Sequence, residues 1–122
     1  MTRKVLTLAA LGAAMAVTAC APTTRFEWGA YEQTLYAYTQ NPENRSVYKT
    51  SLEQTIERGQ KRNAVAPGMH AELGYLYLEE GDSAAALQHF QQERALFPES
   101  AGFMDRVISQ IEPSKAVAGG QN

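Results

Sequence analysis

The chain has few side chains that could carry out chemistry, and their spacing argues against catalysis. Its two histidines, His70 and His89, lie far apart in the sequence, with no other cluster of metal ligands beside either one. Glu79 and Glu80 are adjacent, so on a helix they point to different sides and do not form a carboxylate pair. The sequence contains no glycine-rich phosphate loop, G-x-S-x-G elbow or H-E-x-x-H motif. We therefore expect a protein without catalytic residues, bound metal or cofactor.

The only cysteine, Cys20, has the clearest chemical role. It follows basic residues at Arg3 and Lys4 and an uncharged apolar run over 5–19, which is the order of regions in a signal peptide. The run is shorter than the ~20 apolar residues of a transmembrane helix. Positions 17–20 (VTAC) resemble the bacterial lipobox, with valine in place of the usual leucine. An ordinary signal peptide with a chance cysteine, or a membrane span, is the alternative.

The lipobox resemblance implies a lipoprotein signal peptide over 1–19 and a lipidated tether over 20–26. The cysteine thiol would take a diacylglycerol, and the new amine would be acylated, for example with palmitate. One acyl chain holds a protein weakly at ~0.8 kcal/mol per buried methylene, but three chains would anchor it permanently. Ala21 and Pro22 follow the cysteine, where an inner-membrane retention signal usually has aspartate. The resemblance therefore implies the outer membrane, with the protein facing the periplasm.

Size and charge narrow the class of protein further. About 100 residues would remain after cleavage, which suits one small domain. The formal net charge is −2, and loss of Arg3 and Lys4 would make the mature chain more acidic. An acidic, exported chain argues against a nucleic-acid partner. Acylated Cys20 would leave no cysteine for a disulfide or a thiolate metal site.

Helical spacing of apolar side chains predicts an all-α domain of about five helices over 27–111, arranged as antiparallel hairpins. The last helix is expected to bury Phe103, Val107 and Ile111. Gly81 is expected to end the third helix in a left-handed conformation. The expected helix starts are Glu27, Ser46 as a cap, Pro67, Asp82 or Ser83 as a cap, and Ser100 as a cap. Small and polar residues over 112–122 predict a disordered tail.

Residues 67–100 carry the most informative pattern, because their types and spacing resemble a tetratricopeptide repeat, a helix–turn–helix unit of about 34 residues. In this register Gly74 and Ala86 lack bulk, so the two helices can approach closely. His70 and Glu93 depart from the pattern, which usually has a large aromatic and a small residue at these positions. The other matching positions are Leu73, Tyr77, Gly81, Phe90 and Pro98, and the same stretch also contains Pro67, Gly68 and Phe97. A generic helical hairpin is the alternative.

The chain from Trp28 to Ile111 also resembles a family of short Gram-negative outer-membrane lipoproteins of unknown function. The resemblance rests on the segment from Trp28 to Tyr31, on PGxHAxLG from Pro67, and on ERxLFPES from Glu93 followed by FM at 103–104. Such lipoproteins tend to be encoded beside a curli-secretion-channel-like lipoprotein and a second small lipoprotein. The resemblance implies a protein partner in outer-membrane secretion or envelope assembly, and it implies no chemistry.

A single repeat leaves one face unburied, so we expect the hairpin over 28–59 to stack before it. The expected groove residues are those of the third helix that face away from the fourth: Ala71, Tyr75, Leu78 and Glu79. Alternatively, the first hairpin covers this face. The leading hypothesis is a non-catalytic adaptor that binds a peptide or protein. A pilot factor that escorts a channel lipoprotein and an envelope enzyme are the other hypotheses, and no nucleophile–base or carboxylate pair supports the enzyme.

Glu93 falls on the apolar face of its helix, three residues after Phe90. A buried carboxylate is costly unless it is paired. We expect His70 to be its partner, with Arg106 and Tyr77 as alternatives. The competing interpretation places the carboxylate at the edge of the face, in solvent.

Replacing Cys20 tests the lipid anchor. Cys20→Ala should abolish labelling by a radioactive fatty acid and should release the protein from membranes or block its processing, because the acceptor thiol is gone. Continued labelling of the Cys20→Ala protein would contradict the lipobox interpretation.

Overall fold

The computed structural model describes residues 24–119, with side chains described up to Glu112. The expected signal peptide over 1–19 and Cys20 lie outside this range. In chain order the elements are α2 (Tyr31–Gln40), η2 (Pro42–Asn44), α3 (Arg45–Lys61), α4 (Met69–Glu79), α5 (Ser83–Leu96), η3 (Pro98–Ser100) and α6 (Ala101–Gly119). Within the described residues the predicted all-α class with five helices is confirmed.

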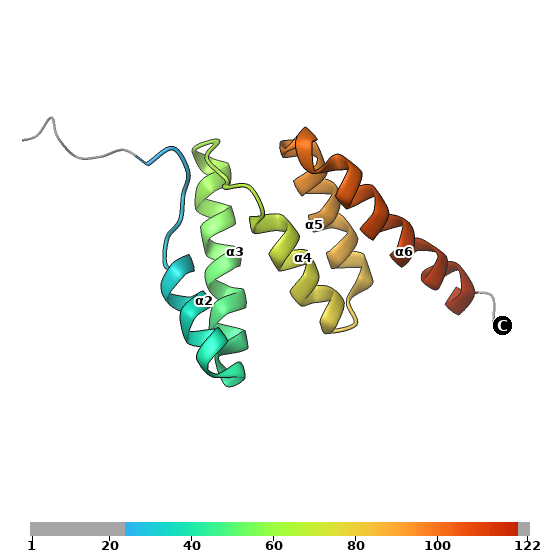
Figure 1. The fold of residues 1–122 in the computed structure, drawn as a ribbon, viewed down its shortest axis with the longest axis horizontal. Coiled ribbons are helices and arrows are strands. Elements are labelled where there is room, and N and C mark those ends of the chain that lie inside the picture. Colours follow the sequence, from blue (N-terminus) through green and yellow to red (C-terminus); the bar gives the residue numbers. More distant parts are fainter. Residues whose placement is uncertain (1–23, 120–122) are drawn as a thin grey trace, which may run out of the picture.

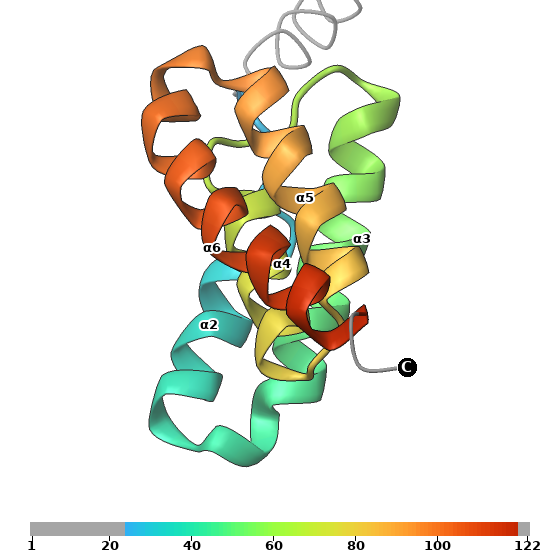
Figure 2. The ribbon, with the colours of Figure 1, turned by 90° about the vertical axis from the view of Figure 1, so that its right-hand side faces the viewer.

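The five α-helices stand side by side in chain order, and each runs opposite to the one before it (Figure 1). Every α-helix packs against its neighbour in sequence: α2 on α3, α3 on α4, α4 on α5, and α5 on α6. Viewed from the α6 end, α4 lies in a second row behind α5 and α6, with α2 and α3 beyond it (Figure 2). Helix α4 is therefore the central element. None of the described helices has both the length and the apolar character needed to cross a membrane.

The segment before α2 is extended, which corrects the expected helix start at Glu27. The backbone N–H of Glu27 donates to the carbonyl of Ala64 (2.7 Å), and Glu27 pairs with Val65 as an isolated bridge. Its carboxylate also lies 2.9 Å from Arg62 and 3.5 Å from Arg58. These contacts tie the entry segment to the end of α3 and the α3–α4 connection, so Glu27 is not part of the helix, which begins at Tyr31.

Two of the predicted turns are confirmed. Gly81 ends α4 with a φ of 83°, in the left-handed region that favours glycine. Asp82 caps α5, because its Oδ1 accepts from the backbone N–H of Ala85 (3.0 Å).

Two other predicted helix starts are wrong, and at a third, where α6 begins directly after Ser100 as predicted, only the side-chain cap is wrong. Ser46 lies inside α3, because the 3-10 turn η2 leads directly into Arg45 without a side-chain cap. Pro67 precedes α4, whose N-cap is Gly68 with a φ of 90°. The Ser100 hydroxyl donates back to the carbonyl of Phe97 (2.7 Å), so it closes η3 and does not cap α6.

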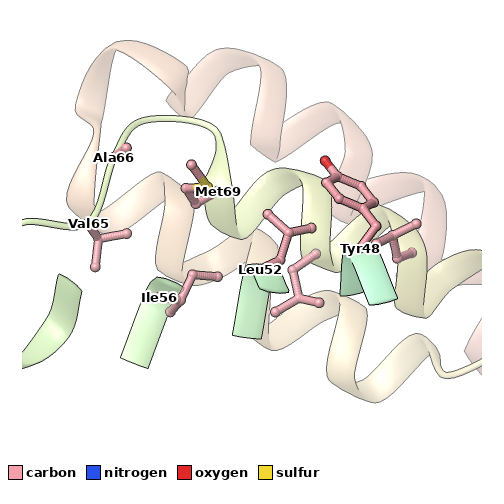
Figure 3. Close-up of a cluster of buried hydrophobic side chains, with 8 residues drawn as sticks. Tyr48, Leu52, Ile56, Val65, Ala66 and Met69 are labelled. Atoms are coloured by element: carbon pink, nitrogen blue, oxygen red, sulfur yellow. The ribbon is translucent and has the colours of Figure 1, made fainter. Parts of the chain in front are cut away.

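A first core cluster joins α3, the connection after it and α4. Tyr48, Leu52 and Ile56 follow one another on successive turns of α3, and Val65 and Met69 lie at the Ile56 end of this row (Figure 3). These side chains recur every four residues, so one face of α3 is buried throughout its length. The remaining buried members are Ala66, Leu73 and Leu76.

A second cluster joins α5 and α6; it includes the predicted Ile111, with Val107 packed against it, but it corrects the prediction for Phe103. Met104 is only 2% exposed and packs with Ala86, Phe90 and Ile111, whereas Phe103 is 60% exposed. Apolar residues occupy both positions 103 and 104, so periodicity alone did not decide which one faces inward. The rotation of α6 about its axis determines which of the two residues faces inward.

Helix α6 is also longer than expected. It extends to Gly119, whereas we expected a disordered tail over 112–122. A proline inside a helix removes one backbone donor, yet α6 continues past Pro113, where Ala116 and Ala118 favour the helical conformation.

Gly74 allows α4 and α5 to cross closely, as the sequence predicts. A Cβ atom at position 74 would lie 2.9 Å from the Phe90 ring and 3.2 Å from the Ala86 carbonyl oxygen. Neither group can retreat easily, because Ala86 and Phe90 are both buried.

Enlarging Gly74 should overpack this crossing. Gly74→Leu should lower the free energy of unfolding by about 1–3 kcal/mol, measured by urea denaturation. Gly102→Leu is the matched control, since a Cβ there meets nothing within 4 Å. Leucine also favours a helix over glycine, so the control should be at least as stable as wild type. Equal stability of the two variants would contradict the close crossing.

Candidate functional site

The four residues that the sequence placed in a groove line one groove in the structure. Ala71, Tyr75, Leu78 and Glu79 border a hollow of about 530 Å³ between α2, α4 and α6. Helix α4 forms its floor, and Figure 2 shows α4 between α2 and α6. Tyr75 is 57% exposed. The first hairpin therefore leaves this face open, in contrast to the alternative in which the hairpin covers it.

The walls of the groove are mostly apolar and partly aromatic. Leu35 and Tyr38 of α2 form one wall, and Phe103, Met104 and Val107 of α6 form the other. Sequence reasoning assigned Phe103 to the core, but this exposed ring belongs to the groove. Helical spacing does place Phe103 and Val107 on the same face of α6, and this was the signal available in the sequence.

A carboxylate that sequence reasoning missed lies in the floor of the groove. Glu72 Oε1 accepts from the hydroxyl of Tyr31 (2.7 Å), and Glu72 Oε2 accepts from the hydroxyl of Tyr48. Burial, followed by the hydrogen bond to Glu72, raises the pKa of Tyr31 to about 12. The same two causes raise the pKa of Tyr48. Both tyrosines therefore keep their protons and serve as donors to Glu72.

The second carboxylate of the groove is neutralised. Arg45 lies 3.0 Å from Glu79, and the same guanidinium donates to the Leu76 carbonyl (2.7 Å). A cation that binds terminal carbonyls stabilises the C-terminal end of a helix. Glu79 and Arg45 thus fasten the end of α4 to the start of α3.

The two histidines meet on the other side of α4, away from the groove. His70 Nδ1 and His89 Nδ1 are 2.9 Å apart, and the ring of Tyr77 stacks on His89 with centroids 5.5 Å apart. The Tyr77 hydroxyl donates to Glu53 (2.8 Å). Burial, followed by the charge of His89, lowers the pKa of His70 to about 4. His70 is therefore a neutral core residue at ordinary pH.

This histidine pair does not make a metal centre by itself. Among the described residues no group of three or more histidine, cysteine, aspartate or glutamate side chains is close enough to hold a metal ion. Sequence reasoning treated His70 and His89 as unrelated because of their separation along the chain. The α4–α5 packing brings them together.

Glu93 caps α4 from the neighbouring helix, which corrects the expected pairing with His70, Arg106 or Tyr77. Its Oε1 accepts from the backbone N–H of Gly68 (2.7 Å), and its Oε2 accepts from the N–H of Ala71 (3.4 Å). Glu93 is 3% exposed, so the interpretation with its carboxylate in solvent is also wrong. The N-cap residue Gly68 has no side chain, and Glu93 supplies the acceptor that a helix N-terminus requires.

Removing this distant cap should destabilise the domain. Glu93→Ala strands the N–H groups of Gly68 and Ala71 and should lower the free energy of unfolding by about 1–3 kcal/mol in urea denaturation. Glu93→Gln should cost less, because its amide oxygen still accepts one hydrogen bond. Identical losses for the two variants, or no loss in Glu93→Ala, would contradict the capping role.

The pH dependence of the same variants tests the burial of Glu93. Burial raises the pKa of Glu93, and the backbone N–H groups of Gly68, Ala71 and His70 only partly offset this shift. A raised pKa contributes stability that is fully present below the unfolded pKa and is lost as pH rises through the folded pKa. Wild type should therefore lose stability relative to Glu93→Gln as pH rises above 4.5, the ordinary pKa of glutamate. A relative gain over that range would contradict the shift.

Comparison with known proteins identifies the family. No curated protein and no solved structure gives a significant match. The sequence profile described as Domain of unknown function (DUF4810) matches residues 26–107. This span contains the whole of α2 to α5, with Glu72 and Glu93, and the part of α6 that carries Phe103 and Met104. The chain belongs to the DUF4810 family, whose function is unknown.

Proposed function

We propose that this protein is a lipid-anchored, non-catalytic adaptor that binds a segment of another protein in the groove over α4. The observation that carries the proposal is the groove itself, an open hollow of about 530 Å³ between α2 and α6. It exposes two aromatic rings, Tyr75 at 57% and Phe103 at 60%. Aromatic side chains are enriched in the centres of protein interfaces, where they contribute large contact areas.

The arrangement of the helices supports a binding role over a catalytic one. Stacked helical repeats form extended concave surfaces that bind other molecules, and α2, α4 and α6 border the groove here. The groove residues are mainly apolar, and its two carboxylates are engaged with tyrosine hydroxyls or with Arg45. Such a surface suits recognition of side chains.

The sequence supports the location and the kind of partner. The lipobox resemblance around Cys20 favours attachment to the periplasmic face of the outer membrane. The resemblance to lipoproteins encoded beside a curli-secretion-channel-like lipoprotein favours a partner from an outer-membrane secretion or assembly system. In this proposal the lipid attaches the protein to the membrane, and the groove determines which partner protein it binds.

A photo-cross-linking amino acid in the groove tests this function in cells. Placed at Tyr75, it should link to one partner protein, because the side chain points into the proposed interface. Tyr36, which is 69% exposed on α2 and does not line the groove, is the matched control and should not give this product.

A variant that removes an aromatic contact of the groove provides a second test. With the cross-linker kept at Tyr75, Phe103→Ala should reduce the yield of the product severalfold, since interface aromatics commonly contribute more than 1 kcal/mol. Equal products from positions 75 and 36 would contradict a binding groove over α4.

A further inference from the structure

The groove contains a negative charge that no positive charge in the described part of the chain balances. Its lining includes two carboxylates, Glu72 and Glu79, and no lysine, arginine or histidine among the described residues. Glu79 is paired with Arg45 at 3.0 Å. None of the ion pairs between described residues involves Glu72, whose two oxygens accept only from the hydroxyls of Tyr31 and Tyr48.

The tyrosine hydroxyls position Glu72 without neutralising it. They satisfy one lone pair on each carboxylate oxygen, and each oxygen has further capacity to accept. The raised pKa values of Tyr31 and Tyr48 have the charge of Glu72 among their causes. Glu72 is therefore held in one place, on the floor of the groove, with its charge unopposed.

The surroundings of Glu72 suit a cation on an apolar stem. Leu35 and Val107 offer aliphatic surface along the groove, and Tyr75, which is 57% exposed, offers an aromatic ring. Lysine and arginine bury their methylene stems against apolar surface while the charged end finds a partner. Aromatic faces add a favourable cation–π contribution.

A purely apolar occupant would be penalised at this position. It would cover the carboxylate of Glu72, remove water from it and offer no compensating charge, which is unfavourable. An acidic occupant would add repulsion. The groove thus selects by charge as well as by shape, in the way that interfaces use an unpaired charge to reject wrong partners.

We propose that the groove recognises a segment of a partner protein in which apolar side chains flank a lysine or arginine, and that Glu72 binds this cation. The inference rests on the proposed adaptor function and specifies the chemistry of the partner. Tyr31 and Tyr48 act as positioning residues, since they orient the carboxylate without touching the ligand's charge.

Three synthetic peptides test the proposal directly. Each is a capped helical peptide of leucine and alanine, about twelve residues long. Its one central position is lysine, norleucine or glutamate. Binding to the full chain is measured by fluorescence anisotropy. Wild type should bind the lysine peptide roughly tenfold more tightly than the norleucine peptide, and the glutamate peptide most weakly. High salt should reduce the preference.

Two variants test whether the preference for the lysine peptide depends on the charge of Glu72. Glu72→Gln keeps an oxygen that accepts from the tyrosines but removes the charge, so the preference for lysine over norleucine should fall to about one. Glu57→Gln removes an exposed carboxylate that lies outside the groove and is paired with Lys61 at 2.7 Å, so the preference should persist. Thermal melts of both variants check that they are folded.

The outcomes separate this inference from the adaptor function. Three results would overturn the role of Glu72. Wild type could bind the norleucine peptide as tightly as the lysine peptide, or could fail to bind the lysine peptide. The folded Glu72→Gln protein could also keep the preference for lysine. The comparison of peptides in wild type needs no variant, so an unfolded Glu72→Gln protein would not prevent the test. The adaptor function itself fails only if position 75 gives no specific cross-link in cells.

Discussion

The hydrogen bonds from the start of α4 to Glu93 of α5 are the interaction on which the rest of the structure depends. Gly68 turns the chain into α4 with a φ of 90°, and it has no side chain to accept from the first N–H groups of the helix. Glu93 reaches across from α5 and accepts from Gly68 and Ala71 instead. A helix held at its N-terminus by its neighbour cannot shift along its axis without losing both bonds.

The close crossing at Gly74 sets the separation of the same two helices, as the Glu93 cap sets their register. The ring of Phe90 occupies the space that a side chain at position 74 would need. At the far end, Arg45 binds the Leu76 carbonyl and Glu79. Helix α4 is therefore fixed at its start, its middle and its end by groups from α3 and α5.

The fixed position of α4 matters because two different faces of this helix are in use. Ala71, Tyr75 and Leu78 recur every three or four residues and face the groove, whereas His70 and Tyr77 face the polar contacts with His89 and Glu53. Glu72 belongs to the groove side, where Tyr31 and Tyr48 bring it into contact with the first hairpin. The hairpins are thus joined by hydroxyl–carboxylate bonds on both sides of a shared apolar core.

The sequence by itself determined the features that depend on neighbours along the chain. Apolar residues every three or four positions indicated the helices, Asp82 and Gly81 marked a turn, and the groove residues of α4 followed from the face opposite α5. Only the tertiary structure decided which of Phe103 and Met104 is buried, and that Glu93 meets the N–H groups of Gly68 and Ala71 while His70 meets His89. These outcomes depend on the rotation of each helix about its axis and on the angle at which helices cross, which many weak contacts between distant residues set jointly. Local spacing along the chain constrains neither quantity. The position of Glu72 in the floor of the groove therefore depends on how α2, α3 and α4 pack together.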